Sequence, residues 1–171
     1  MKNKNIILIG FMGVGKGTIA RELVKNSEYF AVDTDDIIES LENKKIKNIF
    51  EQEGEPYFRG LEKKCALWCE HNLTNTIIST GGGFYKQENL NSIGTVIYLE
   101  STFDAILEGI YNSPNAKKKL KKRPLLKDLE SAKKLFDQRI EEYKSVADIV
   151  INIEHIDTAT ASQNILKSLA E

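Results

Sequence analysis

A glycine-rich loop near the start of the chain has the residue types needed to bind phosphate groups. Gly10, Gly15 and Lys16 match the pattern G-x-x-x-x-G-K, and an apolar segment precedes them. Glycines let the backbone turn its N–H groups toward phosphate oxygens, and the helix that follows adds its positive dipole end. The alternative is a strand-to-helix turn that binds nothing. The expected nucleotide contacts are Gly13, Val14, Gly15, Lys16, Gly17 and Thr18.

The last position of this motif departs from the pattern. It holds Gly17, where a serine or threonine normally offers a hydroxyl to a magnesium ion. Thr18 lies about 100° further round a helix and should point away from the usual direction. Because magnesium normally keeps several waters, we expect a water to replace the missing ligand, with Thr18 as the alternative.

Two carboxylates follow the second expected strand, in the segment VDTDD. Asp33 and Asp35 stand at the carboxyl end of that strand, where ligands bind in open α/β sheets. One carboxylate could lie near a metal ion while the other accepts a proton from a substrate hydroxyl. The alternative is structural, because Asp33 or Thr34 could be the N-cap of the next helix, and we assign Asp36 to that alternative.

Two arginines lie beside apolar helix faces. Arg59 and Glu62 are spaced i, i+3, with Phe50 and Phe58 nearby, which favours a guanidinium held in place to bind an anion. The alternative is a surface ion pair worth under ~1 kcal/mol. Arg139 accompanies a similar apolar stripe on a helix expected at 129–145.

Three consecutive glycines, Gly81, Gly82 and Gly83, follow the third expected strand in the segment STGGGF. They permit close backbone approach to a ligand, although a flexible turn would have the same composition.

The segment 109–127 contains seven lysines and arginines and no acidic residue, which leaves 17 basic against 25 acidic residues elsewhere. A solvated face or a nucleic-acid patch is one interpretation. Gly109, Pro114 and Pro124 should interrupt a helix, and no aromatic residues interleave for base stacking. We therefore expect a mobile lid that closes over a polyphosphate.

The two cysteines, Cys65 and Cys69, are spaced i, i+4, with His71 close behind. A structural zinc site would need further ligands, so we interpret the pair as buried thiols in a reducing compartment.

The elements that must position these residues alternate between short apolar strands and helices, which is typical of a parallel sheet covered on both faces. Strands are expected at 5–9, 30–32, 76–79, 95–99 and 148–151. Helices are expected at 17–25, 34–41, 46–53, 56–71, 103–108, 129–145 and 158–169.

The chain of 171 residues fits a single domain spanning 1–171, with 41% apolar residues and a net charge of only −1. This balance gives no overall bias toward nucleic acid or an acidic membrane. No segment reaches the ~20 apolar residues of a membrane span, and the first residues lack a signal-peptide pattern, so we expect a cytoplasmic protein.

Together these motifs resemble the shikimate kinase family over essentially the whole chain. The matching segments are the loop at 10–18, DTD at 33–35, FRGLE at 58–62, GGG at 81–83, RPLL at 123–126 and R-x-x-x-Y at 139–143. The resemblance implies a P-loop kinase fold, an α/β fold of three layers (α/β/α) with a five-stranded parallel sheet of order 2-3-1-4-5 and a mobile lid.

By this resemblance the chain transfers a phosphoryl group from ATP, with Mg²⁺, to the 3-hydroxyl of shikimate, in the aromatic amino-acid (chorismate) pathway. Asp35 would be the base, Lys16 and Arg123 would neutralise the phosphoryl charge, and Arg123 would also contact ATP. Arg59, Arg139 and the three glycines would bind shikimate, the segment 33–62 would form its site, and Asp33 would hold magnesium through water. A monomer with small-molecule partners is implied.

Other functions stay open. A kinase for gluconate or a nucleoside monophosphate would share the loop and lid, and Gly17 leaves room for a nucleotide-binding module with weak catalysis. A second lid arginine that stacks on adenine in this family is absent here, and Tyr111 or a lysine is the expected substitute. The segment 152–155, in the region of the adenine loop, could not be assigned to the site.

Overall fold

The computed structural model describes residues 5–121 and 123–170; both chain ends and Lys122, one cation of the expected lid, lie outside this range. Five parallel strands form one sheet in the order β2-β3-β1-β4-β5, as expected. Central β1 is fully buried, because a parallel sheet covered on both faces has apolar residues on both sides of its strands. The strands are β1 (Ile6–Ile9), β2 (Phe30–Asp33), β3 (Thr76–Ser79), β4 (Thr95–Glu100) and β5 (Ile149–Asn152).

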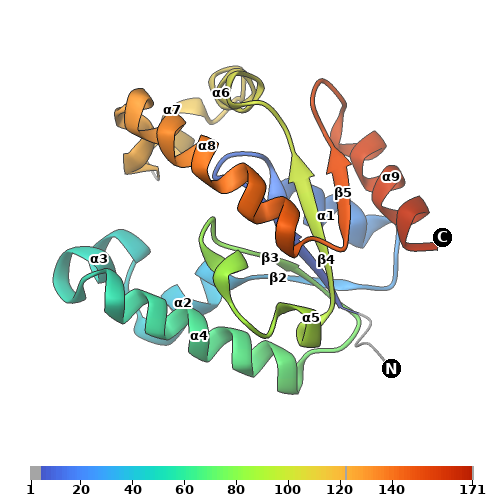
Figure 1. Cartoon of the computed structure of the whole chain (residues 1–171), viewed down its shortest axis with the longest axis horizontal. Coiled ribbons are helices and arrows are strands. Elements are labelled where there is room, and N and C mark those ends of the chain that lie inside the picture. Colours follow the sequence, from blue (N-terminus) through green and yellow to red (C-terminus); the bar gives the residue numbers. More distant parts are fainter. Residues whose placement is uncertain (1–4, 122, 171) are drawn as a thin grey trace.

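Helices cover both faces of this sheet (Figure 1). Helices α1 and α9 pack against each other on one face of the sheet. Helices α4, α5 and α8 lie on the other face. The α-helices are α1 (Lys16–Lys25), α2 (Thr34–Glu42), α3 (Ile46–Glu53), α4 (Glu55–Asn72), α5 (Leu90–Ile93), α6 (Phe103–Tyr111), α7 (Ala116–Lys121), α8 (Leu129–Val146) and α9 (Thr158–Ala170), and 3₁₀ turns span Phe84–Lys86 and Pro124–Lys127. Among the described residues, no helix has the length and apolar character needed to span a membrane.

Local sequence explains where several helices begin. The side chains of Asp33, Thr102 and Asp128 each accept a hydrogen bond from a backbone N–H in the first turn of α2, α6 and α8. Asp157 does the same for α9 through the N–H of Thr160. These caps satisfy donors that have no partner inside the helix, so each one fixes a helix start close to the expected residue.

The segment expected to form a lid contains more helix than we predicted. Helix α6 continues through Gly109 to Tyr111, and α7 forms within the lysine-rich stretch, so the expectation that Gly109 ends the helix is wrong. A glycine costs about 1 kcal/mol inside a helix, which the burial of Ile106 and Ile110 offsets. Lysine is a good helix former, and α7 has no buried residue.

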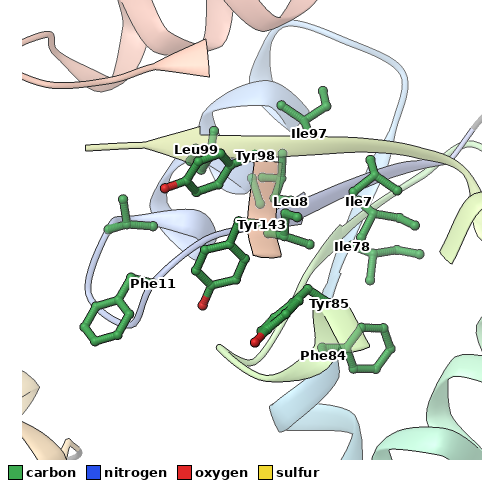
Figure 2. Packing of buried hydrophobic residues seen from close by; sticks show 14 of the residues in the cluster. Ile7, Leu8, Phe11, Ile78, Phe84, Tyr85, Ile97, Tyr98, Leu99 and Tyr143 are labelled. Atoms are coloured by element: carbon green, nitrogen blue, oxygen red, sulfur yellow. The ribbon is translucent and has the colours of Figure 1, made fainter. Parts of the chain in front are cut away.

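An aromatic row joins α8 to the sheet and to the loop after β3. Tyr143 of α8 stacks on Tyr98 of β4 at 5.2 Å and meets Tyr85 edge-on at 4.6 Å between ring centroids (Figure 2). Tyr143 is 1% exposed, so its ring is part of the core while its hydroxyl points toward the edge of the sheet where the strands end. This packing fixes α8, and therefore Arg139, relative to the glycine triplet.

Candidate active site

The glycine-rich loop occupies the carboxyl end of β1 in a conformation that few other residues adopt. Gly10, Gly13 and Gly15 have positive φ angles of 149°, 85° and 107°. At Gly13 a Cβ atom would also lie only 2.5 Å from Cδ1 of Ile110. Glycine is required there for both reasons, and Lys16 follows as the first residue of α1. The loop therefore presents its N–H groups at a helix N-terminus, as phosphate binding needs.

Lys16 is buried beneath this loop. Its Nζ donates to the carbonyls of Gly10 at 2.6 Å and Phe11 at 3.1 Å. Burial lowers the pKa of Lys16 to about 8, although the carboxylates of Asp33 and Asp35 oppose that change. A buried ammonium next to backbone carbonyls gains strongly from a phosphate dianion nearby, since the phosphate compensates its charge.

A cavity of about 380 Å³ opens beside the loop, between α6 and the segment after β5. Val14 and Thr18 line one wall, and Ile153, His155 and Ile156 line another, so the unassigned segment after β5 belongs to this site. Of the expected substitutes for the adenine-stacking arginine, Lys119 lines the cavity. Tyr111 is half exposed and does not.

Asp33 has a structural role as well as its expected one. Its Oδ1 accepts from the N–H groups of Asp35 and Asp36, so Asp33 is the N-cap of α2. Its Oδ2 accepts from the hydroxyl of Ser79 on β3 at 2.7 Å. The structural and functional interpretations of Asp33 therefore do not exclude each other, and the cap orients the carboxylate.

Asp35 is partly buried at the start of α2, and its Oδ1 atom is buried without a hydrogen-bond partner among the described residues. Burial raises the pKa of Asp35 to about 7, with further increases from Asp33 and Glu62 and an opposing effect of Lys16. A carboxylate with a pKa near neutral and an unpartnered oxygen is suited to accept a proton from a substrate hydroxyl.

Arg59 is held by two carboxylates on its own helix, α4. Its Nη1 donates to Glu62 at 2.7 Å, as the i, i+3 spacing predicted, and Glu62 is only 1% exposed. Its Nε and Nη2 both donate to Oε1 of the exposed Glu55, at 3.2 and 2.9 Å. The guanidinium also lies over the ring of Phe58. Glu62 thus fixes the side chain, while Glu55 covers the edge that can bind a carboxylate bidentately.

Arg139 reaches the same region from α8. Its Nη1 donates to the carbonyl of Gly82 at 3.1 Å, and the Tyr143 hydroxyl donates to the same oxygen at 2.7 Å. The guanidinium lies over the ring of Tyr85, whose hydroxyl donates to Glu142. The Nε of Arg139 is buried without a partner among the described residues. An unpartnered donor of this kind favours binding of an anion.

The glycine triplet after β3 lies against three of these side chains in turn. A Cβ atom on Gly81 would come within 2.6 Å of Asp35 Oδ1, and one on Gly83 within 2.5 Å of Arg59 Nη1. A Cβ on Gly82 would be 3.2 Å from Arg139 Nη1. Each glycine therefore makes room for one charged side chain, which explains the triplet better than a flexible turn does.

The Gly81→Ala variant should test this packing. Its methyl group would displace the Asp35 carboxylate, so we expect turnover to fall by a factor of ~10 or more while the fold is retained. Gly60→Ala is the matched control, because a Cβ on Gly60 meets no heavy atom within 4 Å. Steady-state rates and thermal unfolding of both variants provide the measurement. Equal rates for Gly81→Ala and wild type would show that Asp35 accommodates the methyl.

Arg123 comes from the segment between α7 and the 3₁₀ turn at Pro124–Lys127. Its Nη1 donates to the carbonyl of Lys119, and its charge is close enough to affect the pKa of Lys16. The expected lid cation and the loop lysine therefore lie on the same side of the site.

The sequence and the fold both match known proteins. A sequence model described as shikimate kinase matches residues 12–170. The chain belongs to the shikimate kinase family. The shikimate kinase of Helicobacter hepaticus is 39% identical over 149 residues, which cover 87% of this chain and 86% of the relative. The shikimate kinase of Sulfurihydrogenibium sp. is 40% identical over 167 residues, which cover 94% of this chain and 92% of the relative.

Solved structures of the shikimate kinase family agree. The shikimate kinase from Acinetobacter baumannii in complex with shikimate has a TM-score of 0.81 at 30% identity, with 98% of this chain and 93% of that chain covered. The Aquifex aeolicus shikimate kinase has a TM-score of 0.79 at 33% identity, with 97% of this chain and 96% of that chain covered. These matches confirm the expected P-loop kinase fold, and the family uses ATP.

Most of the predicted site residues converge at one edge of the sheet. Cys65 and Cys69 are buried free thiols, and the described residues contain no group of three or more His, Cys, Asp or Glu side chains that could hold a metal ion by themselves. Sequence reasoning missed Ser79, Glu55 and the cavity wall at 153–158. A single hydroxyl, an exposed acid and an irregular segment carry no motif that could have revealed them.

Proposed function

We propose that this chain transfers the γ-phosphoryl group of ATP to the 3-hydroxyl of shikimate, giving shikimate 3-phosphate and ADP. The observation that best supports this is the Asp35 carboxylate, which has an unpartnered oxygen, lies near Lys16 and packs against the same glycine triplet as Arg59 and Arg139. Such an arrangement suits a hydroxyl acceptor that carries a carboxylate of its own.

Asp35 accepts the proton of the 3-hydroxyl as the oxygen attacks the γ-phosphorus. A new O–P bond forms while the bond from phosphorus to the bridging oxygen of ADP breaks, so one proton moves to Asp35 and ADP leaves with the electron pair. Positioning and charge stabilisation supply most of the catalysis in such transfers. Lys16 and Arg123 neutralise the phosphoryl oxygens, with Arg123 brought in by closure of a mobile lid at about 109–127.

Arg59 and Arg139 bind the shikimate carboxylate, with Gly81, Gly82 and Gly83 forming the adjoining wall. The nucleotide lies over the loop at Gly13, Val14, Gly15 and Gly17 and in the cavity beside Thr18. Partners are small molecules, and we infer a cytoplasmic monomer with no nucleic acid or membrane partner.

The residues around Gly17 fit a magnesium ion. Asp33 and Ser79 offer hard oxygen ligands, and Ser79 Oγ lies 3.8 Å from the position that a Cβ on Gly17 would take, beside the phosphate-binding loop. When bound, the ion supplies charge that neutralises the β- and γ-phosphate oxygens. Asp33 would hold the ion through water, and Thr18 would be the alternative ligand on the loop.

Steady-state ATP consumption with and without shikimate tests the proposal. We expect turnover only with shikimate, and a product with the mass and ³¹P signal of a phosphate monoester. Gluconate and nucleoside monophosphates serve as alternative acceptors. Turnover with one of these and none with shikimate would overturn the proposal, and nucleotide binding without turnover would indicate a module with weak catalysis.

The rate should also depend on pH through Asp35. Because a base must be deprotonated to accept the proton, kcat/KM should rise as pH increases through about 7 and then level off. An ordinary aspartate pKa near 4 would instead give a flat profile between pH 5.5 and 8. Rates over this range, at saturating ATP and Mg²⁺, distinguish the two profiles.

A further inference from the structure

We propose that Ser79 supplies the hydroxyl that the phosphate-binding loop lacks at Gly17, and that it positions the magnesium ion together with Asp33. This inference rests on the proposed function, since it concerns the ion that accompanies the nucleotide. It assigns Ser79 as a positioning residue, and it explains how a loop without the usual serine or threonine can still serve a kinase.

The first turn of α1 lies against the end of β3. A Cβ atom on Gly17 would have Ser79 Oγ at 3.8 Å, and the only nearer atom among those found around it is Nη1 of Arg21 at 3.5 Å. A hydroxyl carried by residue 17 would therefore share its immediate surroundings with the hydroxyl of Ser79. The two groups come from different elements but reach the same space.

Ser79 is oriented for this role. It is 3% exposed, and its hydroxyl donates its single hydrogen to Asp33 Oδ2 at 2.7 Å. Its lone pairs are left to accept from a magnesium-bound water or to bind the ion. Adjacent ligands of an octahedral magnesium ion lie about 3 Å apart when each bond is 2.0–2.1 Å long. The oxygens of Ser79 and Asp33 are thus spaced like neighbouring ligands or like a ligand and a bound water.

Thr18 is less suited to replace the loop hydroxyl. Its side chain is exposed and faces the nucleotide cavity. Its Oγ1 accepts a long hydrogen bond from Nη2 of Arg21, at 3.4 Å. The hydrogen bond from the buried Ser79 to the partly buried Asp33 is shorter, at 2.7 Å, so it holds its two oxygens in a more fixed geometry.

Metal binding to the ADP complex tests the inference directly, without turnover. Free Mn²⁺ measured by electron paramagnetic resonance, and Mg²⁺ by competition, give the metal affinity of wild type, Ser79→Ala, Gly17→Ser and the double variant. We expect Ser79→Ala to weaken metal binding about tenfold in the natural chain, as for loss of a hydrogen bond to a charged group. In the Gly17→Ser background, Ser79→Ala should weaken metal binding by less than about twofold.

Two further variants separate this role from a structural one. Ser79→Cys keeps the size and a weak donor but offers magnesium a poor sulfur ligand, so it should weaken metal binding as Ser79→Ala does. Ser162→Ala is the matched control, because Ser162 is also a buried serine and its hydroxyl has no partner among the described residues. ADP affinity without metal should be unchanged in Ser79→Ala, Ser79→Cys and Ser162→Ala, provided that each retains the wild-type unfolding temperature.

Each outcome decides between explanations. The inference would be overturned if Ser79→Ala weakened metal binding equally in the wild-type and Gly17→Ser backgrounds. Wild-type metal affinity in Ser79→Cys would overturn it as well. A large loss in Thr18→Val with none in Ser79→Ala would assign the role to Thr18 instead. Absence of any metal-dependent ADP binding in wild type would contradict the proposed function itself, not only the role of Ser79.

Discussion

The Asp35→Asn variant should lose turnover by a factor of ~10² or more while binding ATP with nearly wild-type affinity. An amide cannot accept the proton of the attacking hydroxyl, and Asp35 lies against Gly81 and does not line the cavity proposed to bind the nucleotide. Single-turnover rates with saturating ATP and shikimate, together with ATP titrations, measure the two effects separately. Turnover within threefold of wild type would contradict the role of Asp35.

The same substitution should increase stability. Because folding raises the pKa of Asp35 from 3.8 to about 7, the folded chain binds this proton more tightly than the unfolded chain. Ionised Asp35 therefore costs stability, and the cost grows as pH rises from about 4 to about 7. At pH 8 the free energy of unfolding of Asp35→Asn should exceed that of wild type by roughly 1 to 3 kcal/mol, and the difference should vanish near pH 4.

Arg59→Lys and Arg139→Lys should each weaken shikimate binding by about 10- to 100-fold and change ATP affinity little. Lysine keeps the charge but loses the planar fork that matches a carboxylate. For Arg59 the change also removes the short hydrogen bond from the guanidinium to the buried Glu62, so the charge of that carboxylate is less well compensated. Shikimate titrations at saturating nucleotide measure the effect.

Glu55→Gln is a control that should change shikimate affinity in the opposite direction. Glu55 occupies the Nε and Nη2 edge of Arg59, so weakening that contact should tighten shikimate binding severalfold while leaving the charge of Arg59 in place. Unchanged shikimate affinity in both arginine variants would move the carboxylate site elsewhere.

Elements with local signals were predictable to within one or two residues. The helix at 46–53 and the strand at 76–79 match the prediction, because the pattern of apolar residues and a following glycine or loop define them without tertiary contacts. Lid helix α7 was missed because helix breakers flank it, while the lysines between them favour a helix.

The sequence singled out the residues of the candidate site, whose roles stay predictions, but not the contacts between them. Gly81 lies against Asp35, and Gly82 accepts from Arg139, across 46 and 57 positions of chain. Only the strand order brings those segments together, and no local pattern encodes the distance between them. The bond from Ser79 to Asp33 belongs to the same class, so its place beside Gly17 required the structure.

The contact between Glu55 and Arg59 has a consequence for which anions can enter. Glu55 is one helical turn from Arg59, so its carboxylate is present there at an effective concentration on the order of millimolar or higher. A dissolved anion that offers only a carboxylate must compete with this tethered one and gains little from displacing it. We expect shikimate to displace Glu55 because its ring hydroxyls make additional contacts. Glu55 would then act as a tethered competitor that disfavours the binding of simple carboxylic acids at Arg59.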